Sequence, residues 1–203
     1  MKTKLSILAV LFLALACVFA AIPASAGTVY DNTGPGSYTT NAWSIYGSSA
    51  VTNSFTLSMS DTVYGANFYV WVLPGDSLNS VTWSITDTAF GTAIATGSAT
   101  GGPNTQVATA FGSYPVLEET ISIPGLNLAA GTYWLQLSNG EDAYDNNVWW
   151  DESDGSSIAF ASGYGSIPSE TFQIIAPEPS SFLLFGSGVL ALVGFATRRK
   201  LLA

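Results

Sequence analysis

The sequence contains no histidine, one cysteine and only five lysine and arginine residues among 203. No lysine or arginine occurs between Lys4 and Arg198, whereas all fourteen acidic residues lie in that interval. Without these side chains the long central segment cannot build Ser-His-Asp systems, lysine bases, imidazole metal sites or arginine clamps for phosphate. Its unbalanced negative charge would also repel the phosphates of a nucleic acid. These absences exclude most catalytic chemistry and make nucleic acid an unfavourable partner.

Carboxylates are the remaining groups that could catalyse a reaction. A glycosidase needs two of them roughly 5 to 10 Å apart, and the sequence places Glu118 beside Glu119 and Asp151 beside Glu152. Neighbouring residues on a strand point to opposite faces, so neither of these pairs is a catalytic pair by itself. We therefore predict that the protein is not an enzyme.

The N-terminus has the features of a secretory signal peptide over residues 1–26. A basic start precedes an apolar run over 5–21, and Ala24 and Ala26 form the small-residue pattern of a signal peptidase site. Cleavage after Ala26 would remove Cys17, the only cysteine. The exported protein would then contain no disulfide and no thiol chemistry.

Two alternatives to this cleavage are a transmembrane helix that stays attached and lipoprotein processing at Cys17. Pro23 and the small residues after it favour cleavage over a retained helix. A lipobox has leucine three residues before its cysteine, whereas Ala14 stands at that position here. The signal peptide is therefore the favoured interpretation.

Residues 181–197 near the other end carry no charge, and as a helix they would span about 26 Å, just enough to cross a bilayer core. Arg198, Arg199 and Lys200 follow directly, and cytoplasmic flanks of membrane helices carry such an excess of basic residues. A buried core helix is the alternative, but it would not need basic residues at its end. We expect a single C-terminal transmembrane helix whose basic tail lies in the cytoplasm.

Pro177, Glu178 and Pro179 precede this segment, and each proline disfavours helix at the residue before it. The Pro-Glu-Pro, the apolar segment and the closing basic cluster together resemble the PEP-CTERM sorting signal over residues 177–203. The resemblance implies a Gram-negative-type bacterium and recognition near the Pro-Glu-Pro by the membrane protease exosortase. It also implies an inner-membrane precursor that is later delivered to the cell surface or to an exopolysaccharide matrix.

The segment between the two ends, residues 27–176, is long enough for one domain with a buried core. Apolar and polar residues alternate over 51–59, 81–86 and 131–138, which is the period-two pattern of half-buried strands. In the first of these stretches the alternation places Met59 on the apolar face.

Turn residues at 74–76, 101–103, 124–125 and 139–140 separate such stretches, and Asn139-Gly140 is the strongest hairpin candidate. No amphipathic helical pattern occurs between them. Roughly ten short strands of this kind predict an all-β fold, a β-sandwich of jelly-roll type.

Acidic residues are concentrated over 141–154, a stretch without a positive partner. Asp142, Asp145 and Asp151 are candidate oxygen ligands for Ca²⁺. The spacing is not that of an EF-hand, because Trp149 falls at a ligand position if Asp145 opens the loop. A solvated acidic loop that keeps the protein soluble is the alternative interpretation.

Tryptophans accompany these acids. Trp149 and Trp150 would face opposite sides of a strand, one toward the core and the other toward solvent or a ligand. Trp134 falls on the face opposite to its apolar neighbours. Aromatic rings beside acids and amides are typical of sugar-binding sites, so all three are candidate carbohydrate-binding residues. Burial under other strands or loops is the alternative.

Two classes of function therefore stay open. The first is a non-enzymatic protein of the cell surface or of an exopolysaccharide-associated matrix, with exosortase as its processing partner. The second is a lectin-like, carbohydrate-binding module with exopolysaccharide as its partner, in which Ca²⁺ would shape the acidic loop.

Overall fold

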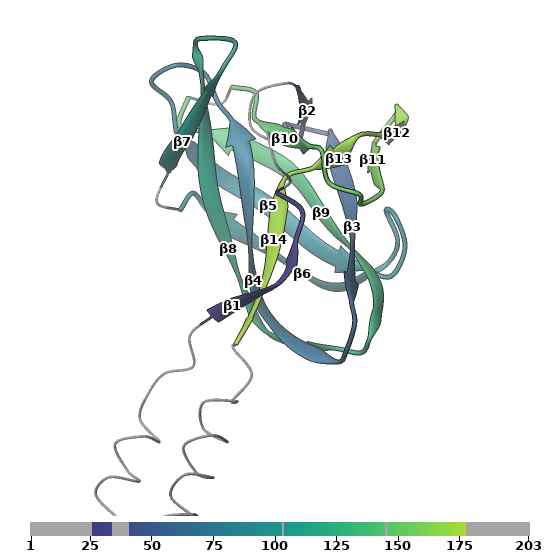
Figure 1. The fold of residues 1–203 in the computed structure, drawn as a ribbon. Helices are drawn as coiled ribbons and strands as arrows, with labels where there is room; N and C mark the ends of the chain where they lie inside the picture. Colours follow the sequence, from purple (N-terminus) through teal and green to yellow (C-terminus); the bar gives the residue numbers. More distant parts are fainter. Residues whose placement is uncertain (1–25, 34–40, 103, 145, 178–203) are drawn as a thin grey trace, which may run out of the picture. The chain divides into compact units, whose positions relative to one another are not determined.

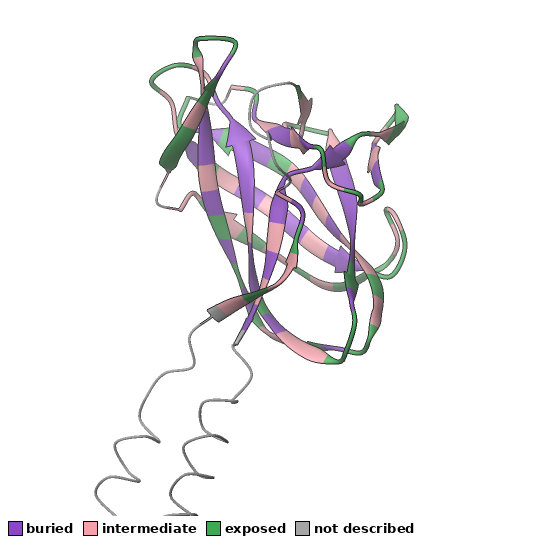
Figure 2. Ribbon diagram, viewed as in Figure 1, coloured by how far each residue is buried: buried purple, intermediate pink, exposed green. Residues whose placement is uncertain are grey.

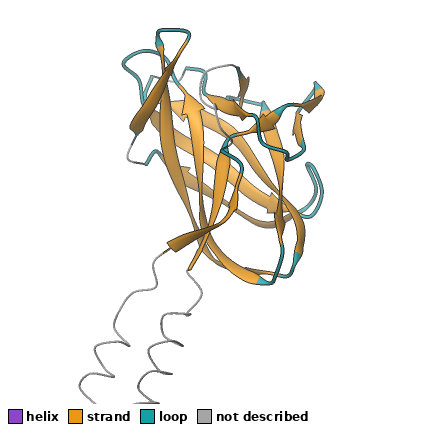
Figure 3. Cartoon of the chain, in the orientation of Figure 1, coloured by secondary structure: helices purple, strands orange, loops and turns teal. Residues whose placement is uncertain are grey.

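The computed structural model describes residues 26–177 except 34–40, 103 and 145. Gly27–Ala176 form one compact unit, and the described residues consist of strands and loops (Figure 3). No helix among the described residues is long and apolar enough to cross a membrane. The predicted membrane helix at 181–197, the basic tail and most of the predicted signal peptide lie outside this part of the chain.

The strands form two antiparallel sheets whose inner faces pack against each other (Figure 1). The first sheet has eight strands: β1 (Ala26–Asp31), β2 (Ala42–Ser44), β4 (Asp61–Trp71), β7 (Thr105–Ala110), β8 (Tyr114–Leu128), β10 (Trp149–Ser153), β13 (Ser169–Glu170) and β14 (Phe172–Pro177). The second has six strands: β3 (Ala50–Leu57), β5 (Leu78–Thr86), β6 (Ala93–Thr100), β9 (Gly131–Asp142), β11 (Ala159–Ala161) and β12 (Gly165–Ile167). The prediction of an all-β sandwich is confirmed.

Strand β4 organises the first sheet. It pairs with β8 along one edge, and with β14 and then β10 along the other. Strand β1 lies next to β14, β7 pairs with β8, and β2 and β13 pair with β10. The order in the second sheet is β12-β11-β3-β9-β5-β6. Consecutive strands such as β3, β4 and β5 therefore alternate between the two sheets.

The period-two pattern decides which side chains enter the space between the sheets. Figure 2 shows buried positions alternating with more exposed ones along strands such as β9, whereas β3 and β4 are buried along most of their length. Most of the predicted inward residues of three strands are buried: Val51, Phe55 and Leu57 of β3, Val81, Trp83 and Ile85 of β5, and Leu135 and Leu137 of β9. Tyr133 of β9, predicted on the same face, is half-buried and packs against the core. Met59 differs from its prediction and is 67% exposed, because β3 ends at Leu57 and the chain turns before β4 begins.

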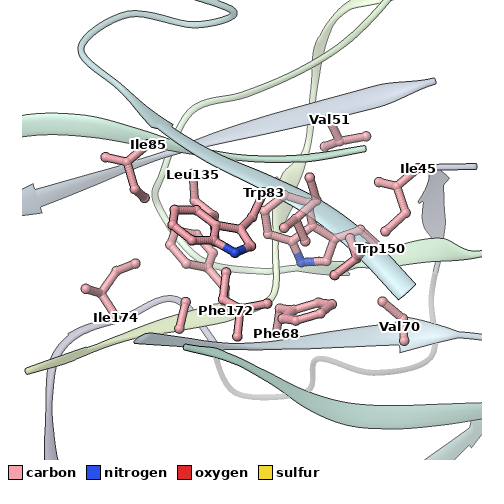
Figure 4. Packing of buried hydrophobic residues seen from close by; sticks show 14 of the residues in the cluster. Ile45, Val51, Phe68, Val70, Trp83, Ile85, Leu135, Trp150, Phe172 and Ile174 are labelled. Atoms are coloured by element: carbon pink, nitrogen blue, oxygen red, sulfur yellow. The ribbon is translucent and has the colours of Figure 1, made fainter. Parts of the chain in front are cut away.

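Large aromatic rings fill the centre of this core. Figure 4 shows Phe68, Trp83, Trp150 and Phe172 packed among aliphatic side chains from both sheets. The rings of Trp150 and Phe172 have centroids 5.8 Å apart and planes at 70°, which is the edge-to-face arrangement that aromatic pairs favour. Rings of this size contribute much of the apolar area that is buried when the two sheets associate.

The strongest predicted hairpin is not a turn in the structure. The turn predicted at 74–76 does occur between β4 and β5, but Asn139 and Gly140 lie inside β9. Asn139 has a φ of 49°, and the pairing of β9 with β5 shifts register at this level. The amide of Gly140 donates a hydrogen bond to the carbonyl of Ile45 at 2.7 Å. Asn139-Gly140 is thus an irregularity within a strand, where the chain approaches a neighbouring segment closely.

Pro124 and Gly125 likewise lie inside a strand, β8, and do not connect two strands. Gly125 has a φ of 57°, and the register between β8 and β4 shifts between Val63 and Gly65. A proline within a sheet is tolerated at such a bulge, since no ladder hydrogen bond is required from its nitrogen there. Both residue pairs that predicted turns, Asn139-Gly140 and Pro124-Gly125, therefore lie at irregularities within long strands, β9 and β8.

Substitution of Gly140 should reveal how close this approach is. A Cβ at this position would stand 2.9 Å from Cγ1 and 3.1 Å from Cδ1 of Ile45. We expect Gly140→Ala to lower the free energy of unfolding by about 1–3 kcal/mol, as other overpacking substitutions do. Ile45→Ala alone should cost about 2–5 kcal/mol, but less in the Gly140→Ala background, because it removes both Cγ1 and Cδ1. Urea denaturation of the four proteins measures this coupling, and strictly additive effects would contradict the close approach.

Candidate functional site

The outer face of the second sheet carries a continuous row of uncharged side chains. Its members are directly opposite one another on all six strands: Ser166 (β12), Phe160 (β11), Thr52 (β3), Gln136 (β9), Ser84 (β5) and Thr96 (β6). They face outward because the residues on either side of them in each central strand, such as Leu135 and Leu137, are buried in the core. The alternation that builds the core thus also builds this surface.

Two aromatic rings stand on this face. Trp134 lies two residues before Gln136 on β9, between Ser54 of β3 and Thr86 of β5. Its ring centroid is 5.7 Å from that of Phe160, with the ring planes at 44°. Both side chains are half-buried. The prediction that Trp134 points away from the core therefore agrees with its position, and Phe160 joins it from a distant part of the sequence.

Hydroxyl and amide groups surround the two rings. Thr56 and Thr132, the next pair on this face after Ser54 and Trp134, contact each other through their Oγ1 atoms at 3.0 Å. Farther along the same face, Asn139 Nδ2 donates to Thr82 Oγ1 at 3.4 Å. The Oγ1 atom of Thr52, between Phe160 and Gln136, is buried and has no hydrogen-bond partner. We call Trp134 and Phe160, together with the polar side chains around them, the Trp134 face. Its members offer apolar ring surface and neutral hydrogen-bonding groups.

Trp149 lies on the other sheet. It pairs in register with Trp71 on the outer face of the first sheet, and its ring is 6.2 Å from that of Tyr114, with planes at 85°. Phe111, which is 70% exposed, lies edge-on to Trp71 at 5.5 Å. Trp134 and Trp149 therefore belong to different sheets, and the structure does not bring them into one site.

Trp150 is a core residue. It is 0% exposed, and its Nε1 donates a hydrogen bond to the carbonyl oxygen of Thr171 at 2.9 Å. The expectation that neighbours Trp149 and Trp150 face opposite sides agrees with this arrangement. A completely buried indole presents no ring face to a polysaccharide, so Trp150 is not part of the Trp134 face.

The candidate calcium ligands that the structure describes have hydrogen-bond partners within the protein. Asp142 Oδ1 accepts hydrogen bonds from the backbone amides of Tyr144 and Asn146, at 3.0 and 2.7 Å. The two carboxylate oxygens of Asp151 accept hydrogen bonds from Trp71 Nε1 and Thr171 Oγ1.

Asp145, the third candidate ligand, lies outside the described residues. Within the described part of the chain no three acidic or cysteine side chains are grouped to hold a metal ion. Convergence of Asp142, Asp145 and Asp151 on calcium stays a prediction.

The sequence does not predict that the carboxylates of Glu119 and Glu170 are buried. Glu118 and Glu119 point to opposite faces of β8, as expected for neighbours, and Glu118 accepts a hydrogen bond from the Tyr69 hydroxyl at 3.1 Å. Glu119 is 1% exposed, and its Oε2 accepts a hydrogen bond from the amide of Gly102 at 2.7 Å. Burial raises the pKa of Glu119 to about 7, although the Gly102 amide opposes this increase. The second such residue, Glu170, lies on β13 and is 0% exposed.

Nothing in the local sequence identifies these two residues as buried. Glu119 has an acidic neighbour and Glu170 follows Pro168-Ser169, which are both common surroundings for surface residues. For Phe160 a weak signal exists, because Ala159-Phe160-Ala161 alternates small and large side chains. Its position beside Trp134 depends on the pairing of β11 with β3, which is not a local property of the sequence.

The comparisons with known proteins identify the C-terminal segment. Residues 176–200 match the PEP-CTERM protein-sorting motif, so the resemblance found at Pro177-Glu178-Pro179 is confirmed. The motif implies an exported protein that exosortase processes at the membrane. The proposed sites within this motif, including Glu178, Pro179, Arg198, Arg199 and Lys200, lie outside the described residues, as does Ala24 of the predicted signal peptidase site.

The other two comparisons concern curated proteins and solved structures. No curated protein matches the chain. Among solved structures, FlgD from Xanthomonas campestris, a protein of flagellar hook capping, is similar with 18% sequence identity and a TM-score of 0.23. The match covers 61% of this chain and 88% of that one. A TM-score this low supports no conclusion about the fold or the function of the domain.

The raised pKa of Glu119 predicts a specific pH dependence of stability. The folded protein keeps this proton up to about pH 7, whereas the unfolded chain releases it near 4.5. The contribution of Glu119 to stability is thus complete below pH 4.5 and is lost as the pH rises to about 7, with a limiting slope of about 1.4 kcal/mol per pH unit. Urea denaturation across this range in a chelating buffer should give a flatter profile for Glu119→Gln than for the wild type. Glu118→Gln is the matched control, and equal slopes for Glu119→Gln and wild type would refute the assignment.

Proposed function

We propose that the protein is a non-enzymatic component of the cell surface or of an exopolysaccharide matrix, and that its domain binds polysaccharide through the Trp134 face. The PEP-CTERM motif supports export and processing by exosortase. The absence of histidine, lysine and arginine from residues 27–176 supports a role without catalysis. The precursor would carry a signal peptide over 1–26, one domain over 27–176, and a membrane helix at about 181–197.

The domain is, in this proposal, a jelly roll. Eight of its strands form the jelly roll, and we number these eight from first to eighth in chain order: β1, β3, β4, β5, β6, β8, β9 and β14. The orders β1-β14-β4-β8 and β3-β9-β5-β6 pair the first with the eighth, the second with the seventh, the third with the sixth and the fourth with the fifth. This pairing is that of one long hairpin of eight strands wrapped into two sheets.

The Trp134 face is the observation that carries the polysaccharide proposal. A sugar ring has an apolar face of C–H groups and a polar edge of hydroxyls, so it requires an aromatic surface with hydrogen-bonding groups beside it. Trp134 and Phe160 provide the aromatic surface, with ring centroids 5.7 Å apart. Gln136 with Ser84 opposite it, and the exposed Thr56 and Thr132, provide the polar groups. The cross-strand neighbours of Trp134 and Phe160 are neutral, which favours a neutral polysaccharide.

A binding experiment with two matched tryptophan variants tests this proposal. Affinity electrophoresis through neutral and acidic exopolysaccharides should show retardation of the wild-type protein. Trp134→Ala should weaken binding roughly tenfold or more, because the sugar loses its main apolar contact. Phe160→Ala should weaken it in the same direction.

Trp149→Ala is the control, since it removes a half-buried indole from the outer face of the other sheet. Melting temperatures verify that all variants are folded. If the wild type is not retarded by any polysaccharide, or if only Trp149→Ala affects retardation, the Trp134 face is not the binding site. A protein that binds no polysaccharide would act in the matrix through its structure alone.

The sorting tail generates a second prediction. Replacement of Pro177, Glu178 and Pro179 by alanine should leave membrane insertion unchanged, because the apolar length of 181–197 determines insertion. It should remove the extended segment before the helix. The uncut precursor should then accumulate in the inner membrane, and the domain should be missing from the surface and the medium.

Cell fractionation with an antibody against the domain measures this outcome. Replacement of Arg198, Arg199 and Lys200 by glutamine is the comparison, and it should weaken retention of the C-terminus in the cytoplasm. If the alanine variant reaches the outside in wild-type amount and size, the Pro-Glu-Pro is only a stiff linker.

A further inference from the structure

Glu170 has a buried carboxylate without a hydrogen-bond partner. The residue is 0% exposed, and neither Oε1 nor Oε2 is hydrogen-bonded in the structure. Its backbone is well held, because its amide donates to Asn53 Oδ1 at 3.0 Å and its carbonyl accepts from Asn32 Nδ2 at 2.6 Å. Buried polar atoms are nearly always paired, and an unpaired one indicates a missing partner such as an ion.

A second carboxylate lies directly opposite. Glu152 of β10 pairs with Glu170 of β13 in the antiparallel ladder, so the two side chains leave the sheet on the same face, with Cβ atoms about 4.5–5.5 Å apart. Glu152 Oε1 accepts hydrogen bonds from Asn41 Nδ2 at 2.8 Å and Trp43 Nε1 at 2.7 Å. These donors fix the Glu152 carboxylate in place. Two like charges directly opposite each other are otherwise unfavourable in a sheet.

No side chain of the domain can neutralise this pair. Residues 27–176 contain no lysine, arginine or histidine. Burial, together with the nearby Glu152 and Asp151, raises the pKa of Glu170 well above its usual range. The remaining ways to compensate the charge are a bound proton and a metal cation. A proton on Glu170 would allow a single O–H···O hydrogen bond to an acceptor such as Glu152 opposite it, whereas a divalent cation could be bound by both carboxylates at once.

The available ligand atoms are oxygens only. Zinc and copper sites in proteins rely on imidazole and thiolate groups, which are absent from residues 27–176. Ca²⁺ binds six to eight oxygens, including carboxylates, carbonyls and water, in flexible geometry, while Mg²⁺ requires a nearly ideal octahedron. Glu152 is partly exposed, so water can complete the coordination from that side.

We propose that Glu170 and Glu152 bind a calcium ion between β13 and β10. This site differs from the calcium ligands predicted in the acidic loop, Asp142, Asp145 and Asp151. The ion would connect the β10 region to β13, which is short and has only two residues. It would also be independent of polysaccharide binding, because the Trp134 face belongs to the other sheet.

Terbium luminescence tests the proposal directly, since Tb³⁺ replaces Ca²⁺ in oxygen sites and is sensitised by nearby tryptophan. Trp43 donates its hydrogen bond to Glu152, one of the proposed ligands. Full-length protein, purified in detergent at pH 8, should show Tb³⁺ emission on tryptophan excitation, and Ca²⁺ should displace it. Glu170→Gln and Glu152→Gln should each weaken Tb³⁺ binding at least tenfold. Glu141→Gln is the matched control, because Glu141 is an exposed acid whose Oε2 accepts from Ser80, and it should leave binding unchanged.

Melting temperatures separate loss of the site from loss of the fold. Ca²⁺ should raise the melting temperature of the wild type relative to chelator, and the increase should be larger at pH 8 than at pH 5, where the cation must displace a proton. Glu170→Gln should melt at or above the wild type in chelator and should not respond to Ca²⁺. Wild-type protein without Tb³⁺ emission and without a Ca²⁺ response would show that Glu170 is simply protonated, and undiminished binding by Glu170→Gln would place any calcium elsewhere. Either result overturns the proposal.

Discussion

The burial of one face of each sheet is the constraint on which the other features of this domain depend. Two sheets can associate only if alternate residues of their central strands are apolar and point inward. In β3, β5 and β9 those residues are aliphatic and aromatic except for Asn53 of β3, and they pack together with Trp150 and Phe172. The same alternation assigns every intervening residue to the outside. The row from Ser166 to Thr96, and Trp134 beside it, are thus the necessary complement of the core.

The absence of positive side chains forces buried acids to use neutral donors. Asp151 is bound by an indole N–H and a threonine hydroxyl, Asp142 by two backbone amides, and Glu119 by the amide of Gly102. Such donors can stabilise a carboxylate, but they do not cancel its charge. Glu170 is the residue for which no such donor is present. In a protein without lysine or arginine between its two ends, a cation from solution is the natural substitute.

The C-terminal motif and the domain have different roles in the protein. The motif concerns delivery, and it can be identified from the sequence because a protease and a membrane act on short contiguous features: an extended Pro-Glu-Pro, an apolar length and a basic end. The domain concerns what is delivered. Its candidate surface combines Trp134 and Phe160, which are far apart along the chain and meet only through the pairing of β11, β3 and β9.

The sequence by itself determined the all-β class, the inward faces of β3, β5 and β9, the opposite orientations of Trp149 and Trp150, and the sorting motif. Each of these depends on local periodicity or on a contiguous motif. Only the tertiary structure decided that Asn139-Gly140 and Pro124-Gly125 lie within strands, that Trp134 and Trp149 belong to different sheets, and that Glu170 is buried opposite Glu152. These features depend on which strand lies beside which. Strand pairing joins residues that are distant in sequence. A period-two pattern determines which face of a strand each side chain occupies, but it does not determine which strands are paired.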